Sequence, residues 1–91
     1  MINKENQIFL EKMEDRIMDY KLDYSLFKKY CDYFINLYSL KLEIDYLKYA
    51  YLLSDANVIE PNNQKDLLEL YEYKYKIKNI VKELEEQKKT K

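Results

Sequence analysis

The sequence predicts an all-α fold, in which three helices form an elongated bundle built on a long antiparallel helical hairpin. Apolar residues recur at steps of three and four along most of the chain, which is the helical period. The chain has no Gly, and its one Pro is Pro61, so nothing interrupts a helix in the first sixty residues. A length of 91 residues fits one domain spanning residues 1–91.

The first predicted helix covers about residues 4–22. Its apolar stripe is Leu10, Met13, Ile17, Tyr20 and Tyr24. Asp23 and Ser25 are suited to begin the next helix, because their side chains can accept a hydrogen bond from a free backbone N–H. Since neither Gly nor Pro separates the two helices, a single continuous helix is the alternative.

The second predicted helix covers about residues 24–55 and follows a coiled-coil rhythm of nearly four heptads. The heptad positions are Leu26, Tyr30, Tyr33, Leu37, Leu40, Ile44, Leu47 and Tyr51. A second apolar stripe, which includes Tyr46, Tyr49 and Leu53, lies on nearly the opposite side. A helix that is apolar almost all round must be covered almost all round. We therefore expect a second copy or a larger protein to cover Tyr46, Tyr49 and Leu53.

The third predicted helix follows a break around Pro61 and covers about residues 63–88, with a frayed tail at 87–91. Its stripe is Leu70, Tyr73, Ile77, Ile80 and Leu84. Apolar and charged residues also alternate over 71–78, which is a strand pattern. The flanking segments are rich in strong helix formers, and this favours a helix.

The composition excludes most catalytic chemistry. Without His there is no Ser-His or Cys-His pair, and without Gly there is no phosphate-binding loop of the usual kind. The single Cys31 cannot form an intramolecular disulfide, and its place on the apolar arc predicts a buried, inert thiol. We expect a protein that is not an enzyme, has no cofactor and acts on no small-molecule substrate.

An acidic row on the first predicted helix is the one candidate for a metal site. Glu11, Asp15, Asp19 and Asp23 follow one another at steps of four. The row lies opposite the apolar stripe, beside Lys12 and Arg16. A solvated face is the favoured interpretation, so we expect no bound metal.

Charge and hydropathy predict a cytoplasmic protein. Sixteen basic and seventeen acidic side chains leave a net charge of −1, which is not typical of a general nucleic-acid binder. The N-terminus lacks the apolar core of a signal peptide, and no uncharged run is long enough to cross a membrane. The abundance of Tyr, Lys, Asn and Ile with no Gly indicates an AT-rich genome, such as that of a low-GC bacterium, its phage or a mobile element. For a phage protein, the compartment is the host cytoplasm.

A basic-aromatic flank on the third predicted helix is the other candidate site. It consists of Tyr71, Lys74, Tyr75, Lys78 and Lys82. Rings between lysines can grip an acidic protein surface or stack on nucleic-acid bases. For the flank taken alone, an ordinary surface on which lysine stems cover tyrosine rings is the favoured interpretation.

Together these features predict a small helical protein-binding module without catalytic activity. It would act by steric binding of a larger protein, as an inhibitor, anti-defence or antitoxin-like protein of a phage or mobile element, or it would self-associate as a homodimer. The alternative is a small dimeric nucleic-acid-binding regulator that uses the basic-aromatic flank.

Overall fold

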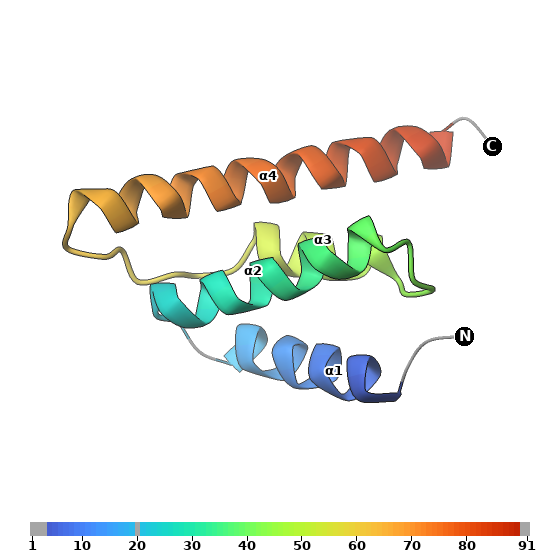
Figure 1. Cartoon of the computed structure of the whole chain (residues 1–91), viewed down its shortest axis with the longest axis horizontal. Coiled ribbons are helices and arrows are strands. Elements are labelled where there is room, and N and C mark those ends of the chain that lie inside the picture. The colour runs from blue at the N-terminus through green and yellow to red at the C-terminus, as the bar shows by residue number, and fades with distance from the viewer. Residues whose placement is uncertain (1–3, 20, 90–91) are drawn as a thin grey trace.

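The computed structural model describes residues 4–19 and 21–89, and this part of the chain is all-α, as predicted. Its helices are α1 (Lys4–Asp19), α2 (Tyr24–Ser39), α3 (Tyr46–Ser54) and α4 (Gln64–Lys89) (Figure 1). The described residues contain no strand, only an isolated bridge between Leu22 and Val58. The segment 71–78 is therefore helical, and its strand-like alternation does not form a strand.

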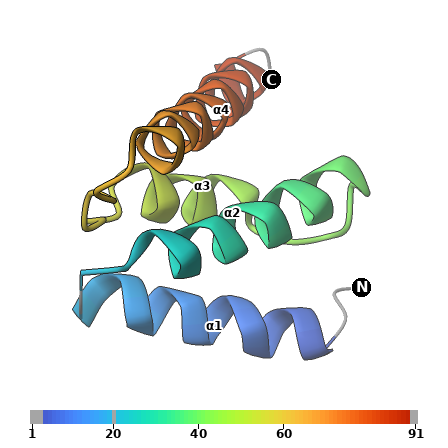
Figure 2. The ribbon, with the colours of Figure 1, turned by 60° about the vertical axis from the view of Figure 1, so that its left-hand side comes forward.

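The helices form a compact bundle. Successive helices run in opposite directions, and α2 and α3 lie between α1 on one side and α4 on the other (Figures 1 and 2). The radius of gyration is 13.3 Å, close to the roughly 12 Å of a compact domain of this length. The molecule measures 42 × 28 × 22 Å. The prediction of an elongated three-helix bundle is therefore wrong, because the described chain folds into four helices.

The predicted helix 24–55 is broken between residues 40 and 45. The N–H of Lys41 donates to the Tyr38 carbonyl at 3.1 Å, and the N–H of Leu42 donates to the Leu37 carbonyl at 3.5 Å. This pattern is a Schellman motif, which requires a residue with positive φ after the helix. Lys41 occupies that position with a φ of 54°. The heptad rhythm therefore continues across a chain reversal, and Leu40 is 59% exposed instead of buried.

α3 folds back onto the rest of the chain and contacts α1, α2 and α4. Asp45 begins it by accepting a hydrogen bond from the Lys48 N–H at 3.1 Å. Tyr49 and Leu53 lie in the core, and the half-buried Tyr46 donates its hydroxyl to the carbonyls of Leu37 and Leu42. The expectation that these residues of the second stripe form an uncovered side is therefore wrong, because the reversal lets the same chain cover them.

α1 and α2 are separate helices. α1 ends at Asp19, before the predicted end at residue 22, and residue 20 lies outside the described residues. Asp23 caps α2, because its carboxylate accepts a hydrogen bond from the Leu26 N–H at 2.8 Å and another from the Ser25 hydroxyl at 3.0 Å. The alternative of one continuous helix is wrong.

α4 lies close to its predicted bounds. Asn63 caps its start by accepting a hydrogen bond from the Asp66 N–H at 2.8 Å. The helix continues to Lys89, so residues 87–89 of the predicted frayed tail are helical. Residues 90 and 91 lie outside the described residues.

One core joins all the helices. Its largest fully buried side chains are Phe27, Phe34, Leu10, Met13, Leu22, Leu53, Leu70, Ile77 and Cys31. Burial raises the pKa of the Cys31 thiol to about 12, with a smaller contribution from Asp32, so the thiol stays protonated at neutral pH. The expected burial of Cys31 is confirmed.

Candidate interaction surface

The inner side of α4 is joined to α2 and α3 by tyrosine hydroxyls that donate to carboxylates. The pairs are Tyr24 with Glu69 at 2.7 Å, Tyr38 with Glu83 at 2.8 Å, Tyr51 with Glu85 at 2.5 Å and Tyr73 with Asp32 at 2.7 Å. Hydrogen bonds to an ionised acceptor are stronger than those between neutral groups. These bonds fix the rotation of α4 about its own axis, and so decide which residues it presents to solvent.

Burial and these bonds raise the pKa of the tyrosines, and at one pair the bond also lowers the pKa of the carboxylate. Burial, followed by the bond to Glu83, raises the pKa of Tyr38 to about 12. Burial and the carboxylate partner also raise the pKa of Tyr24 and of Tyr73. The Tyr24 hydroxyl lowers the pKa of Glu69, and the Lys28 ammonium at 3.6 Å adds to this effect. At neutral pH the tyrosine of each of these pairs is therefore a neutral phenol, and the carboxylate of Glu69 is ionised.

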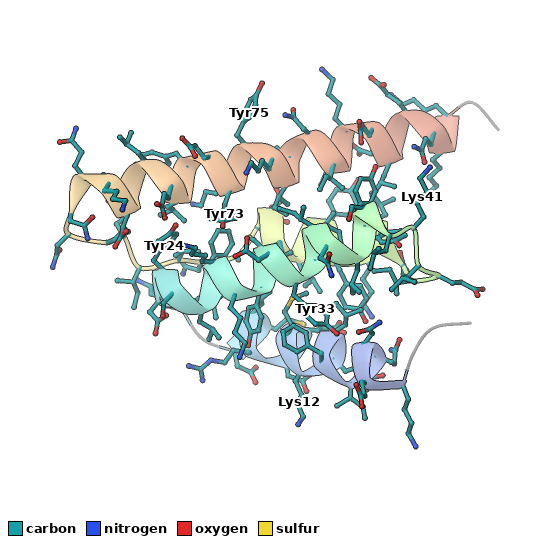
Figure 3. All side chains as sticks on the ribbon, in the orientation of Figure 1. Lys12, Tyr24, Tyr33, Lys41, Tyr73 and Tyr75 are labelled. Carbon is teal, nitrogen blue, oxygen red and sulfur yellow. The ribbon has the colours of Figure 1, made fainter. Side chains whose placement is uncertain are left out.

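The outer side of α4 carries large apolar side chains in solvent. Leu68 is 55% exposed, Tyr71 50% and Tyr75 68%. Figure 3 shows Tyr75 pointing away from the other helices, whereas Tyr73 points towards α2. We call this surface the α4 outer face. It consists of Leu68, Tyr71, Lys74, Tyr75, Lys78 and Lys82.

The α4 outer face is also positively charged. Lys78 and Lys82 are exposed and Lys74 is half-buried, and none of them forms an ion pair with another described residue. Between residues 73 and 82 the helix carries no carboxylate. The nearby Glu69 and Glu83 are turned towards α2, where they accept the tyrosine hydroxyls. Lysines therefore dominate the outer side of this stretch.

The residues predicted to bind a partner fall into two groups. Those of the basic-aromatic flank, listed as Tyr71, Lys74, Tyr75, Lys78 and Lys82, lie together on the α4 outer face. Those of the second stripe, listed as Tyr46, Tyr49 and Leu53, lie in or against the core, so the structure does not join the two groups in one surface. Sequence reasoning missed Leu68. Its position, three residues before Tyr71 and seven before Tyr75, puts it on the same side of a helix and could have identified it.

The acidic row of α1 is divided in the structure. Asp23 lies beyond α1 and caps α2, and Glu11 accepts a hydrogen bond from the Gln7 amide at 2.9 Å. Asp15 and Asp19 are exposed. Within residues 4–19 and 21–89, no three His, Cys, Asp or Glu side chains are placed to hold one metal ion.

A shallow groove lies between α1 and α3, away from the α4 outer face. It has a volume of about 500 Å³, and Ile17, Met18 and Tyr51 are among its lining residues. The ion pair between Lys48 and Glu14, at 3.2 Å, lies at this groove. This ion pair joins two of the three charged residues that line the groove, and Asp55 is the third.

None of the helices in the described part of the chain is both long enough and apolar enough to span a membrane.

Comparisons of the chain with protein-family models, with curated proteins and with solved structures gave no match. The case for a function therefore depends on the residues and the geometry described above.

Proposed function

We propose that this protein is a non-catalytic binding module whose α4 outer face docks on an acidic surface of a larger protein. The observation that carries the proposal is the row of exposed apolar side chains, Leu68, Tyr71 and Tyr75, flanked by lysines without ion pairs. Exposed apolar patches with a polar rim are typical of protein interfaces.

The tyrosines are suited to anchor such an interface. Each buries a large ring when a partner covers it, and its hydroxyl can still find a hydrogen bond at the edge. Neither Tyr71 nor Tyr75 has a partner for its hydroxyl among the described residues, so both are free to bind. Tyrosine is among the residues that most often dominate binding energy.

The lysines decide what kind of surface the partner presents. Lys74, Lys78 and Lys82 outnumber Glu72 and Glu86, the exposed carboxylates at the two ends of the face, so the face keeps a net positive charge. Complementary charge accelerates association and discriminates against wrong partners. The partner surface is therefore acidic, with apolar sites that accept the rings.

Small size and the lack of His and Gly support a steric mode of action in the cytoplasm. A domain of 11.3 kDa can cover a functional site on a larger protein and block it without chemistry. Inhibitors, anti-defence proteins and antitoxin-like proteins of phages and mobile elements act in this way, and the AT-rich composition fits such an origin.

Site-specific photo-crosslinking in cells of the native host tests the proposal. A photoreactive phenylalanine derivative replaces Tyr75 in one variant and Lys12 in the control. Lys12 is exposed on α1, on the far side of the molecule from α4 (Figure 3). We expect a discrete protein adduct from position 75 and none from position 12. Adding Lys78→Glu and Lys82→Glu to the position 75 variant should abolish the adduct, whereas Lys12→Glu should not.

Two outcomes would overturn the proposal. Equal adducts from both positions would mean that the contact is not specific to α4. An adduct at position 75 that nuclease treatment removes would identify nucleic acid as the ligand. In that case fluorescence anisotropy with a labelled single-stranded oligonucleotide should show binding that Tyr71→Ser and Tyr75→Ser weaken, because stacked bases lose their platform.

A further inference from the structure

The turn between α2 and α3, residues 40–45, has a backbone conformation that its sequence does not favour. Lys41 has a φ of 54°, a region in which every residue except Gly is disfavoured by its Cβ atom. Gly is the usual residue at this position of a Schellman motif. The turn contains neither Gly nor Pro, and Leu40, Lys41, Leu42 and Glu43 are residues that form helices readily.

The sequence of the turn is equally suited to a helix. The heptad rhythm of α2 and α3 runs through it without a break, from Leu37 through Leu40 and Ile44 to Leu47. In the observed turn Leu40 is left 59% exposed. In a continuous helix these four residues share one side, and a neighbouring helix covers them.

We infer that two copies of this chain exchange their α3–α4 halves, with the turn 40–45 converted to helix. Each chain then has one helix from Tyr24 to Ser54, and its α3–α4 half packs on the α1–α2 half of the second copy. This is domain swapping, in which the contacts of the monomer reform between chains. The bond of Tyr24 to Glu69 and the bridge of Leu22 to Val58 are examples of contacts that become intermolecular.

Identifiable contacts hold the monomer closed. Asp45 caps α3 through the Lys48 N–H, and the Tyr46 hydroxyl donates to the carbonyls of Leu37 and Leu42 across the turn. A continuous helix loses these bonds, but it removes the positive φ of Lys41 and adds helical backbone bonds. Since the core contacts are the same in both states, protein concentration decides between them.

The exchange would join two copies of the candidate binding surface in one dimer. A swapped dimer presents two α4 outer faces, since that face is not part of the exchanged contacts. Two linked faces raise the apparent affinity for a partner with two sites. The gain in affinity rests on the proposed function, whereas the exchange itself does not, because it uses the turn and the core alone.

Substitutions of Lys41 test the exchange. Lys41→Gly relieves the positive φ of the monomer and weakens the continuous helix, whereas Lys41→Ala does neither. After refolding from denaturant at high protein concentration, light scattering should show dimer for the wild type and for Lys41→Ala. The association constant for dimerisation of the Lys41→Gly variant should be lower than that of the wild type by roughly 100-fold or more. Tyr46→Phe removes the hydrogen bonds across the turn and should raise this association constant by about tenfold.

Distance measurement separates an exchanged dimer from two closed monomers in contact. Spin labels replace Lys12 on α1 and Glu86 on α4, both exposed, in a Cys31→Ala background with native helicity. Labelled chains are refolded with an excess of unlabelled chains, so that only the distance within one chain is measured. The inference requires a longer distance in the dimer than in the monomer. An unchanged distance, equal dimer fractions for Lys41→Gly and Lys41→Ala, or a wild type that stays monomeric after refolding would each overturn it.

Discussion

The two sides of α4 use tyrosine for opposite purposes. Tyr73 is half-buried, points to α2 and donates to Asp32 at 2.7 Å. Tyr75, two residues later, is 68% exposed and has no hydrogen-bond partner among the described residues. Residues two apart on a helix are turned by about 200° from each other. Both residues are tyrosines and each is followed by a lysine, so their different roles follow from their angular positions on the helix.

The charges of α4 are divided in the same way. Glu69, Glu83 and Glu85 accept hydroxyls from α2 and α3, whereas Lys78 and Lys82 face solvent. Carboxylates therefore occupy the contacts of α4 with α2 and α3. Over residues 73–82 lysines supply the charges of its exposed side, and the exposed Glu72 and Glu86 lie beyond the two ends of that stretch. The net charge of −1 conceals this separation, because it sums both sides.

Truncation of one residue on each side should give the largest contrast. Ile77 is fully buried on the inner side of α4. We expect Ile77→Ala to lower the free energy of unfolding by about 2–5 kcal/mol, because it leaves a cavity in a small core. Tyr75→Ala should change it by less than about 0.5 kcal/mol, since Tyr75 is already 68% exposed in the folded protein. Urea unfolding followed by circular dichroism measures both values, and similar losses for the two variants would refute the division of α4 into two sides.

Alkaline pH should weaken the contacts of the buried tyrosines, among them those on the inner side of α4. Burial and carboxylate partners raise the pKa of Tyr24, Tyr38 and Tyr73 in the folded protein above the ordinary value of about 10. Above that pH the unfolded chain releases phenolic protons that the folded chain retains, so the free energy of unfolding falls as pH rises. The stabilisation is complete below pH 10 and is lost progressively as pH rises through the folded pKa values, which for Tyr38 is about 12.

Melting temperatures measured between pH 8 and pH 12 would test this dependence. The wild type should melt at a constant temperature up to about pH 10 and at falling temperatures beyond it. A variant with Tyr24, Tyr38 and Tyr73 all replaced by Phe should show a shallower fall. The matched variant with Phe at Tyr71 and Tyr75 should follow the wild type. If the melting temperatures of both variants fall equally steeply, the bonds of Tyr24, Tyr38 and Tyr73 do not control the pH dependence.

Periodicity predicted α1 and α4 well, because the residues buried in a helix must recur at its own period. It failed at residues 40–45 for a physical reason. The reversal there depends on the positive φ of Lys41 and on backbone hydrogen bonds to the carbonyls of Tyr38 and Leu37. No Gly or Pro marks this turn in the sequence. The heptad rhythm continues through the turn, so composition alone favours the wrong structure.

The same turn explains which part of the candidate site could be predicted. The basic-aromatic flank lies on one regular helix, so turning each residue by its helical angle places Tyr71, Tyr75 and Lys78 on one face. Covering Tyr49 and Leu53 depends on α3 folding back, a tertiary event that periodicity does not encode. An apolar surplus on a predicted helix can thus be resolved within the chain as well as by a partner.

The smallest contrast concerns single hydroxyl groups. Tyr73→Phe removes the bond to Asp32 but keeps the ring. We expect a loss of about 0.5–1.5 kcal/mol in the free energy of unfolding, near the lower end because the exposed Asp32 carboxylate can return to water. Tyr75→Phe removes a hydroxyl that solvent already hydrates, so its effect should be close to zero. Urea unfolding of both variants, with the double variant to check additivity, would measure the difference. If the two single losses are equal, the bond between Tyr73 and Asp32 contributes nothing net. The orientation of α4 would then depend on the packing of Leu70, Ile77 and Ile80 and on the three other tyrosine–carboxylate bonds.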